Sequence, residues 1–218
     1  MLPVEVLLNI ILSFIIVLFQ VIGLLGLILV GSSRFREDGT INKSVILIIV
    51  GSVEIIYLVI NERIYYLIQG IMGPITLQLL AMRSALYGLV PNVISLITFG
   101  VLFLYLGIKN KENYGKLLMF SAIFRVVCGI ILIVPYSIDL LSYLPLSIPN
   151  QVEHIIFRVG LLIASIASII MITSSVFFMR YASKINVKLL FYSSIFLFVA
   201  SILFFVNSLI LITYYGIL

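Results

Sequence analysis

Long apolar runs separated by three short basic segments constrain the fold of this chain most strongly. The first run, residues 6–30, contains no charged residue and exceeds the roughly 20 apolar residues that an α-helix needs to cross a bilayer. Because no water reaches the backbone inside hydrocarbon, such a run must satisfy its own hydrogen bonds as a helix. The sequence therefore predicts an all-α, polytopic integral membrane protein.

The composition supports a single membrane domain. Of the 218 residues, 63% are hydrophobic and 10% are charged, whereas a soluble domain carries roughly 25% charged residues. Nearly all residues fall in apolar runs or short connectors, so the chain has no room for a separate soluble domain. We predict one transmembrane domain over residues 1–218.

Six helices of near-spanning length are expected, joined as three hairpins. Their predicted ranges are 6–31, 44–60, 84–108, 117–136, 155–179 and 189–215. Residues 64–82 are long enough for a seventh span, but that span would put one basic loop on the opposite side from the other two. Gly70, Gly73 and Pro74 interrupt this segment, so we predict an outer interfacial or re-entrant piece.

The basic loops predict the orientation. Residues 32–43, 109–116 and 180–188 hold nine of the 13 Lys and Arg residues. An excess of Lys and Arg marks the cytoplasmic side of a membrane protein. With an even number of spans, both chain ends then lie outside, and we expect a multi-pass protein of the cell membrane.

An internal triplication is a further expectation. The segment KLLMFSAIFRVV from Lys116 resembles KLLFYSSIFLFV from Lys188, and Lys43 opens the equivalent helix of the first copy. Chance similarity between apolar runs is the alternative. A proline precedes the first helix of each copy, and the candidate repeats are 3–73, 74–148 and 149–218. Copies with the same orientation lie around an axis parallel to the membrane normal.

Two ionisable residues fall deep within predicted spans. Glu54 follows Lys43 by eleven residues, and Arg125 follows Lys116 by nine, so their depths differ by only about 3 Å. Intramembrane charges are costly and are functional candidates. We predict an interhelical Glu54–Arg125 pair, which is either a structural bridge or a gate or substrate contact. The remaining alternative is that each residue faces a different partner, such as another subunit.

Two further groups of polar residues are candidates. The first group predicts an outer vestibule, and its members are Arg83, Glu153, His154 and Arg158. The alternative is that these side chains are simply solvated or reach the headgroups by snorkelling. The second group predicts a polar layer around the axis, and its members are Gln20, Asn92 and Ser165. The alternative is that they form ordinary interhelical hydrogen bonds of about 1 kcal/mol each. Pro91 is expected to kink its helix. Small residues, including Gly23, Gly26 and Gly100, are expected to let helices approach closely.

The sequence predicts no catalytic residue, metal or cofactor. His154 is the only histidine and Cys128 the only cysteine, which excludes bis-histidine haem ligation within the chain and disfavours a zinc site. Nucleotide-binding, zinc-protease and serine-hydrolase motifs are absent from the sequence. The net charge of +5 lies at span ends and does not indicate nucleic acid. Membrane lipids, other membrane subunits or a second copy are the expected partners.

We therefore expect a protein that is not an enzyme but a subunit or scaffold of a membrane complex. The alternative is a small carrier or channel with a midplane polar site near Glu54 and Arg125. The layout is similar to that of carriers built from three two-helix repeats. Their Pro-x-Asp/Glu-x-x-Lys/Arg motif is absent after Pro3, where no basic residue follows Glu5 at the required position, so we assign no family.

Overall fold

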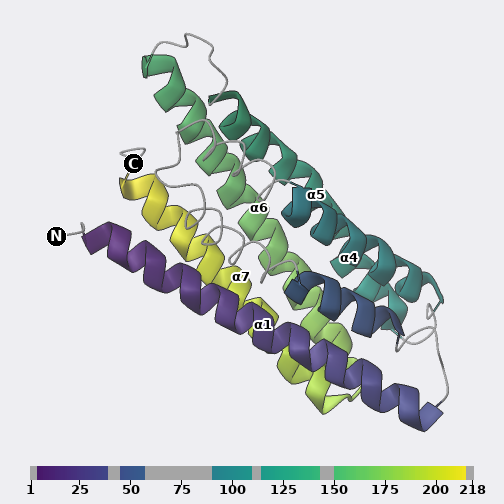
Figure 1. Ribbon diagram of the computed structural model, residues 1–218. Helices are drawn as coiled ribbons and strands as arrows, with labels where there is room; N and C mark the ends of the chain where they lie inside the picture. The colour runs from purple at the N-terminus through teal and green to yellow at the C-terminus, as the bar shows by residue number, and fades with distance from the viewer. Residues whose placement is uncertain (1–3, 39–44, 57–89, 110–113, 143–149, 215–218) are drawn as a thin grey trace, which may run out of the picture.

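The computed structural model describes residues 4–38, 45–56, 90–109, 114–142 and 150–214 (Figure 1). These residues form helices, which confirms the all-α prediction for the described part of the chain. The helices are α1 (Val4–Asp38), a short helix (Val45–Ile56), α4 (Val90–Lys109), α5 (Lys116–Ser142), α6 (Asn150–Lys184) and α7 (Lys188–Tyr214).

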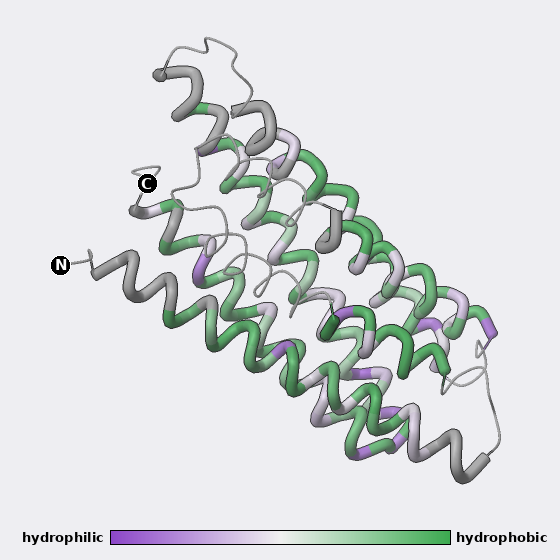
Figure 2. Tube along the Cα trace, viewed as in Figure 1, coloured by the Kyte–Doolittle hydropathy of each residue, from purple (hydrophilic) through white to green (hydrophobic). Residues whose placement is uncertain are grey.

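Four of these helices are long and apolar enough to cross a membrane. The segments that qualify are Phe14–Ser33, Lys116–Pro135, Arg158–Lys184 and Lys188–Ile210. Hydrophobic residues run along most of each helix in Figure 2. The helices at Val45–Ile56 and Val93–Lys109 are apolar but shorter. A membrane protein is therefore supported, while the six spans and the three hairpins stay predictions. The 64–82 segment lies outside the described residues.

Several helices are longer than the sequence predicted. α1 continues to Asp38 instead of ending at residue 31, and α6 runs from Asn150 to Lys184 instead of 155–179. The prediction ended each helix where charged residues begin. Lys, Arg and Glu are good helix formers, so charge marks the edge of the hydrocarbon rather than the end of the helix. Much of the expected 32–43 and 180–188 loops is therefore helical.

The end of α5 is a second correction. The prediction ended this helix at residue 136, but α5 passes Pro135 and continues to Ser142. Proline removes one backbone donor, which usually interrupts a helix in water. In membrane helices proline is tolerated because neighbouring groups satisfy the freed carbonyl. Pro135 is buried. The expected kink at Pro91 falls at the edge of the described residues and stays a prediction.

The helices surround a shared core in a definite order. α4 packs on α5, α5 on α6, α6 on α7, and α7 on α1. The short helix contacts α1 at Gly51, where an added Cβ would lie 2.7 Å from Ile28 Cγ1 and 2.9 Å from the Leu24 carbonyl oxygen. It contacts α4 through a hydrogen bond from Ser95 to Glu54. The order around the bundle is therefore short helix, α1, α7, α6, α5, α4 and back to the short helix.

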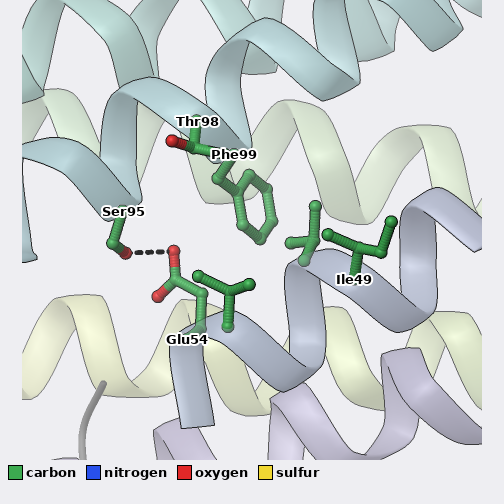
Figure 3. A pocket seen from close by; sticks show the side chains of 7 residues that line it. Ile49, Glu54, Ser95, Thr98 and Phe99 are labelled. Atoms are coloured by element: carbon green, nitrogen blue, oxygen red, sulfur yellow. Dashed lines mark hydrogen bonds between the residues drawn. The ribbon is translucent and has the colours of Figure 1, made fainter. Parts of the chain in front are cut away.

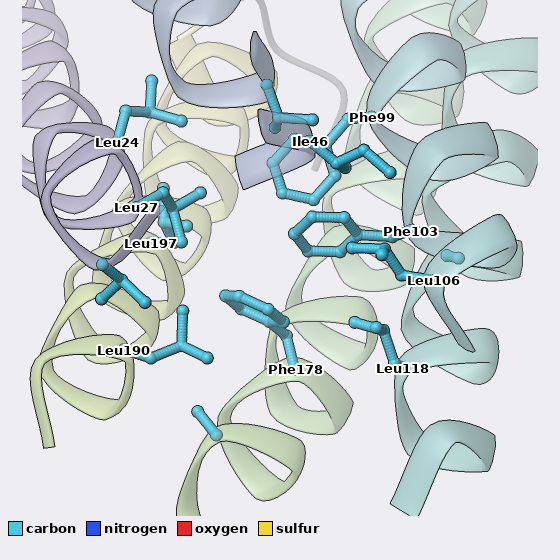
Figure 4. Close-up of a cluster of buried hydrophobic side chains, with 14 residues drawn as sticks. Leu24, Leu27, Ile46, Phe99, Phe103, Leu106, Leu118, Phe178, Leu190 and Leu197 are labelled. Carbon is cyan, nitrogen blue, oxygen red and sulfur yellow. The ribbon is translucent and has the colours of Figure 1, made fainter. Parts of the chain in front are cut away.

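Apolar side chains from all six helices fill the centre of this bundle (Figure 4). Phe103 is fully buried, and its ring centroid lies 4.2 Å from that of Phe99 and 5.1 Å from that of Phe178. Leu27 of α1 and Leu118 of α5 pack in the same cluster. A smaller apolar cluster joins α4, α5 and α6, and it consists of Val93, Leu96, Cys128, Leu132 and Ala167.

Glycines bring neighbouring helices close together, as the sequence predicted. A Cβ added to Gly26 of α1 would overlap the Ser193 hydroxyl oxygen of α7 and lie 3.0 Å from the Ser193 Cβ. A Cβ on Gly100 of α4 would lie 2.9 Å from the Ala122 carbonyl oxygen of α5. A side chain at either position would force its neighbours to shift, so these glycines allow the close spacing of two helix pairs.

α5 and α7 bury matching positions of their similar sequences. The buried residues form equivalent pairs when Lys116 is aligned with Lys188, namely Leu118 with Leu190, Ser121 with Ser193, Ala122 with Ser194, and Arg125 with Leu197. The two segments therefore present the same face to the core. The triplication itself stays a prediction.

The basic ends of two helix pairs lie together. The Lys184 ammonium nitrogen at the end of α6 is 5.9 Å from the centre of the Tyr114 ring, which precedes α5.

α1 and α7 run antiparallel, since Gly23 contacts Leu197 while Gly26 contacts Ser193. The start of α1 therefore lies beside the end of α7, as Figure 1 shows. The membrane orientation itself stays a prediction.

Candidate functional site

Glu54 lies where the short helix meets α4. Its side chain is partly buried, and one carboxyl oxygen accepts a hydrogen bond from the Ser95 hydroxyl of α4 (Figure 3). Among the described residues, Ser95 is the hydrogen-bond partner of the Glu54 carboxyl. This bond connects the short helix to α4, so the acidic side chain has a defined position at this interface.

A small open pocket adjoins the Glu54 carboxyl. Its empty volume is about 180 Å³ with its open mouth included, and the enclosed part has room for about one water molecule. The lining residues are Ile49, Val50, Val53, Glu54, Ser95, Thr98 and Phe99. The pocket is therefore a mainly apolar recess to which one acidic residue and two hydroxyl-bearing residues contribute.

Arg125 lies behind this pocket, on α5. Only 4% of the side chain is exposed, and the guanidinium carbon is 3.9 Å from the centre of the Phe99 ring. A desolvated cation over an aromatic face is stabilised by about 2 kcal/mol. The Nε atom is buried without a hydrogen-bond partner among the residues that the structure describes. The aromatic ring therefore provides much of the environment of this buried cation.

The structure brings the two predicted residues, Glu54 and Arg125, into one cluster. Phe99 lines the pocket beside Glu54 and also lies under the Arg125 guanidinium. The two opposite charges attract each other, but no direct hydrogen bond between them is found in the described residues. A nearby opposite charge reduces the large cost of placing either charge in a low-dielectric core. The role of the pair stays a prediction.

The predicted polar layer is only partly described. Ser165 is buried on α6, and its hydroxyl donates to the Leu161 carbonyl oxygen at 3.0 Å. This bond lies within one helix, so it tests neither the polar layer nor the interhelical bonds of the alternative. Gln20 is partly buried on α1. Asn92 belongs to α4, and its side chain lies outside the described part.

The predicted outer vestibule also remains a prediction. Arg83 lies outside the described residues. Glu153 and His154 belong to the first turns of α6, and their side chains lie outside the described part. Arg158 is exposed on the same helix. The structure therefore places the backbone of three of these residues on one helix and does not test whether they form a site.

Buried serine contacts between helices were missed by the sequence analysis. The Ser174 hydroxyl of α6 donates to the Ser121 carbonyl oxygen of α5 at 2.7 Å, and the two hydroxyl oxygens lie 3.1 Å apart. The Ser175 and Ser201 hydroxyl oxygens connect α6 to α7 at 3.1 Å. The sequence feature that could have predicted these contacts is the repeated serine along α6, because adjacent serines place one hydroxyl toward α5 and another toward α7.

The part of the chain that the structure describes holds no group of three or more His, Cys, Asp or Glu residues arranged to bind a metal ion. Cys128 is a buried free thiol whose sulfur lies 3.4 Å from the Ala167 carbonyl oxygen. Comparison of the chain with protein-family models, curated proteins and solved structures finds no match.

Proposed function

We propose that this chain is a small multi-pass membrane protein that acts as a non-enzymatic subunit or scaffold of a membrane complex. The observation that carries the proposal is the filled centre of the bundle. Phe99, Phe103 and Phe178 occupy the place where the helices meet, and each is at most 2% exposed. A transport path needs polar groups or a cavity near midplane, whereas these side chains pack against one another.

The outer surface is consistent with a membrane setting. Large apolar side chains are exposed on helices around the bundle, including Phe14 of α1, Ile94 of α4, Ile130 of α5 and Ile155 of α6. A surface of this kind needs lipid or partner helices to cover it. We place the protein in the cell membrane with its basic helix ends in the cytoplasm and both chain ends outside, following the distribution of Lys and Arg.

The basic helix ends offer a place for partners. The exposed basic residues at the ends of α4 to α7 are Lys109, Lys116, Arg180, Lys184 and Lys188. Each basic residue near an anionic leaflet contributes about 1 kcal/mol of attraction. Anionic headgroups or an acidic segment of another subunit fit this surface, and nucleic acid is not a partner that this placement favours.

Native purification tests the scaffold proposal. The chain carries a tag, is expressed at its native level and is extracted in mild detergent. The proposal expects a complex in which a second membrane protein is present at constant stoichiometry and is cross-linked to defined residues of the bundle. Recovery of the lone chain as a monodisperse monomer, with no constant partner in several detergents, would contradict it.

A small carrier or channel is the second candidate, and the cluster around Glu54 and Arg125 favours it. Ionisable residues inside membranes often mark substrate or ion pathways. Its test is flux of ions and small solutes in liposomes containing wild type, Glu54→Gln or the control Ser52→Ala. Ser52 lies on the same short helix and does not line the pocket. Flux that Glu54→Gln alone abolishes supports a carrier, and background flux in all three removes this candidate.

A further inference from the structure

The Glu54 carboxyl combines three features in the bundle. It hydrogen-bonds to Ser95, it lines a recess that is open on one side, and it lies near the buried Arg125 cation. A purely structural ion pair usually forms direct, well-satisfied hydrogen bonds, because burial of incompletely paired charges is costly. Here the Arg125 Nε atom lacks a partner in the described residues, and Phe99 contacts the guanidinium.

Among the described residues around Glu54, Arg125 is the charged one. On α4, Ser95 and Thr98 line the pocket and do not titrate. On α1, the residues against the short helix at Gly51 are the apolar Leu24 and Ile28. On α5, Arg125 interacts electrostatically with Glu54 and also with the Cys128 thiol. Within the described part, Arg125 is therefore the cation that interacts with Glu54 when its carboxyl is ionised.

We propose that Glu54 is a proton-binding site. Its carboxylate takes up one proton from a hydronium ion at the open recess, which leaves a neutral carboxylic acid and a water molecule, and it releases the proton by the reverse step. Arg125, next to Phe99, is the fixed positive charge that balances the ionised carboxylate. Ser95 holds the carboxyl at the recess in both states, because a hydroxyl can donate to a carboxylate and either donate to or accept from a carboxylic acid.

The proton site does not depend on the proposed scaffold function, since it concerns one carboxyl and its surroundings. A scaffold can use the site to respond to pH, and a carrier can use it to couple transport to protons. Intramembrane acids that exchange protons are a recognised form of functional residue. Failure of the scaffold experiment therefore leaves this inference standing, and failure of the test below leaves the scaffold proposal standing.

An apolar carbodiimide tests the site in the full chain. Dicyclohexylcarbodiimide partitions into the bilayer and reacts with a protonated carboxyl: the acid proton moves to one carbodiimide nitrogen and the carboxyl oxygen adds to the central carbon. Transfer of the acyl group to nitrogen then gives a stable adduct with no leaving group. The protein is reconstituted in phosphatidylcholine liposomes, and the labelled fraction of Glu54 is measured by peptide mass spectrometry from mildly acid to mildly alkaline buffer.

The proposal expects labelling at Glu54 that decreases as the buffer becomes alkaline, by about tenfold per pH unit once most of the carboxyl is ionised. Glu54→Gln removes the adduct. Arg125→Met, which lacks the balancing charge, extends labelling into more alkaline buffer, whereas the matched Arg125→Lys behaves like wild type. Absence of label at Glu54 in every buffer, labelling that does not depend on pH, or identical behaviour of Arg125→Met and Arg125→Lys would overturn the proposal.

A second measurement needs no Arg125 variant, in case either one does not fold. Infrared difference spectra of the wild-type protein are recorded between acid and alkaline buffer. The proposal expects a protonated-carboxyl band that appears on acidification in wild type and is lost in Glu54→Gln. A band of equal size in both proteins would assign the proton to another group and would reject the site.

Discussion

Substitution of Gly100 by Ala is expected to destabilise the bundle by pushing α4 away from α5. The new Cβ would lie 2.5 Å from Val126 Cγ2, 2.9 Å from the Ala122 carbonyl oxygen and 3.2 Å from the Val126 backbone nitrogen. The Val126 side chain can rotate, but the two backbone atoms cannot move unless the helix moves. Overpacking of this kind costs about 1–3 kcal/mol, and the better helix propensity of Ala returns about 1 kcal/mol. We expect a net loss of up to about 2 kcal/mol.

Gly129→Ala is the matched control on the same pair of helices. Its Cβ would lie 3.1 Å from Ile97 Cγ1, 3.3 Å from Leu96 Cβ and 3.5 Å from the Val93 carbonyl oxygen. A shift of a few tenths of an ångström in the Ile97 side chain accommodates this methyl group. The propensity gain then offsets the contact, and stability should change by less than about 0.5 kcal/mol.

The assay is unfolding in mixed micelles as the denaturing detergent is increased, followed by circular dichroism and fitted to the free energy of unfolding. Adding Val126→Ala to Gly100→Ala should recover part of the loss, because it removes the nearest contact and leaves the Ala122 carbonyl contact in place. Equal stability of Gly100→Ala and Gly129→Ala, or a gain for Gly100→Ala, would refute the close approach of α4 and α5 at this point.

Three further predictions use the same unfolding assay. Phe178→Ala should cost about 3–5 kcal/mol, because it empties a fully buried site at the centre; a loss below about 1 kcal/mol would mean that the centre is loosely packed. Ser174→Ala should cost about 0.6 and at most about 1.7 kcal/mol, because it removes the hydrogen bonds to α5. The control Thr173→Val should change stability little, because the Thr173 hydroxyl bonds within its own helix. Equal effects of the two substitutions would argue against a role for the interhelical bond. Glu54→Gln and Arg125→Met should each destabilise the protein, and exchanging the two charges should recover much of the loss; additive losses in the exchange variant would mean that the two side chains do not interact.

The sequence predicted the helical class better than the helix ends. Hydrophobic run length reports the thickness of hydrocarbon that a segment can cross, and it does not report where hydrogen bonding stops. α1 continues to Asp38 and α5 passes Pro135, since polar and basic residues can extend a helix beyond the apolar layer. The match between Lys116 and Lys188 was informative because equal spacing from a common start gives equal faces on two helices.

The candidate site was predicted in outline. Counting residues from the basic loops placed Glu54 and Arg125 at similar depths, and the structure places both beside Phe99. Depth alone does not specify rotation about the helix axis or the identity of neighbours on a third helix. Ser95 and Phe99 were therefore missed: each lies on α4, and an isolated serine or phenylalanine in an apolar run carries no signal of its own.

Side-specific labelling of introduced cysteines tests most directly whether the bundle crosses the membrane with its basic end in the cytoplasm. In a Cys128→Ala background, one cysteine replaces the exposed Ser183 near the basic end of α6, and another replaces the exposed Thr213 near the end of α7. Intact cells are treated with a membrane-impermeant maleimide before or after permeabilisation. We predict that Thr213→Cys is labelled from outside and that Ser183→Cys is labelled only after permeabilisation. Labelling of both from outside would contradict a spanning bundle, and protection of Thr213→Cys with outside labelling of Ser183→Cys would contradict the orientation.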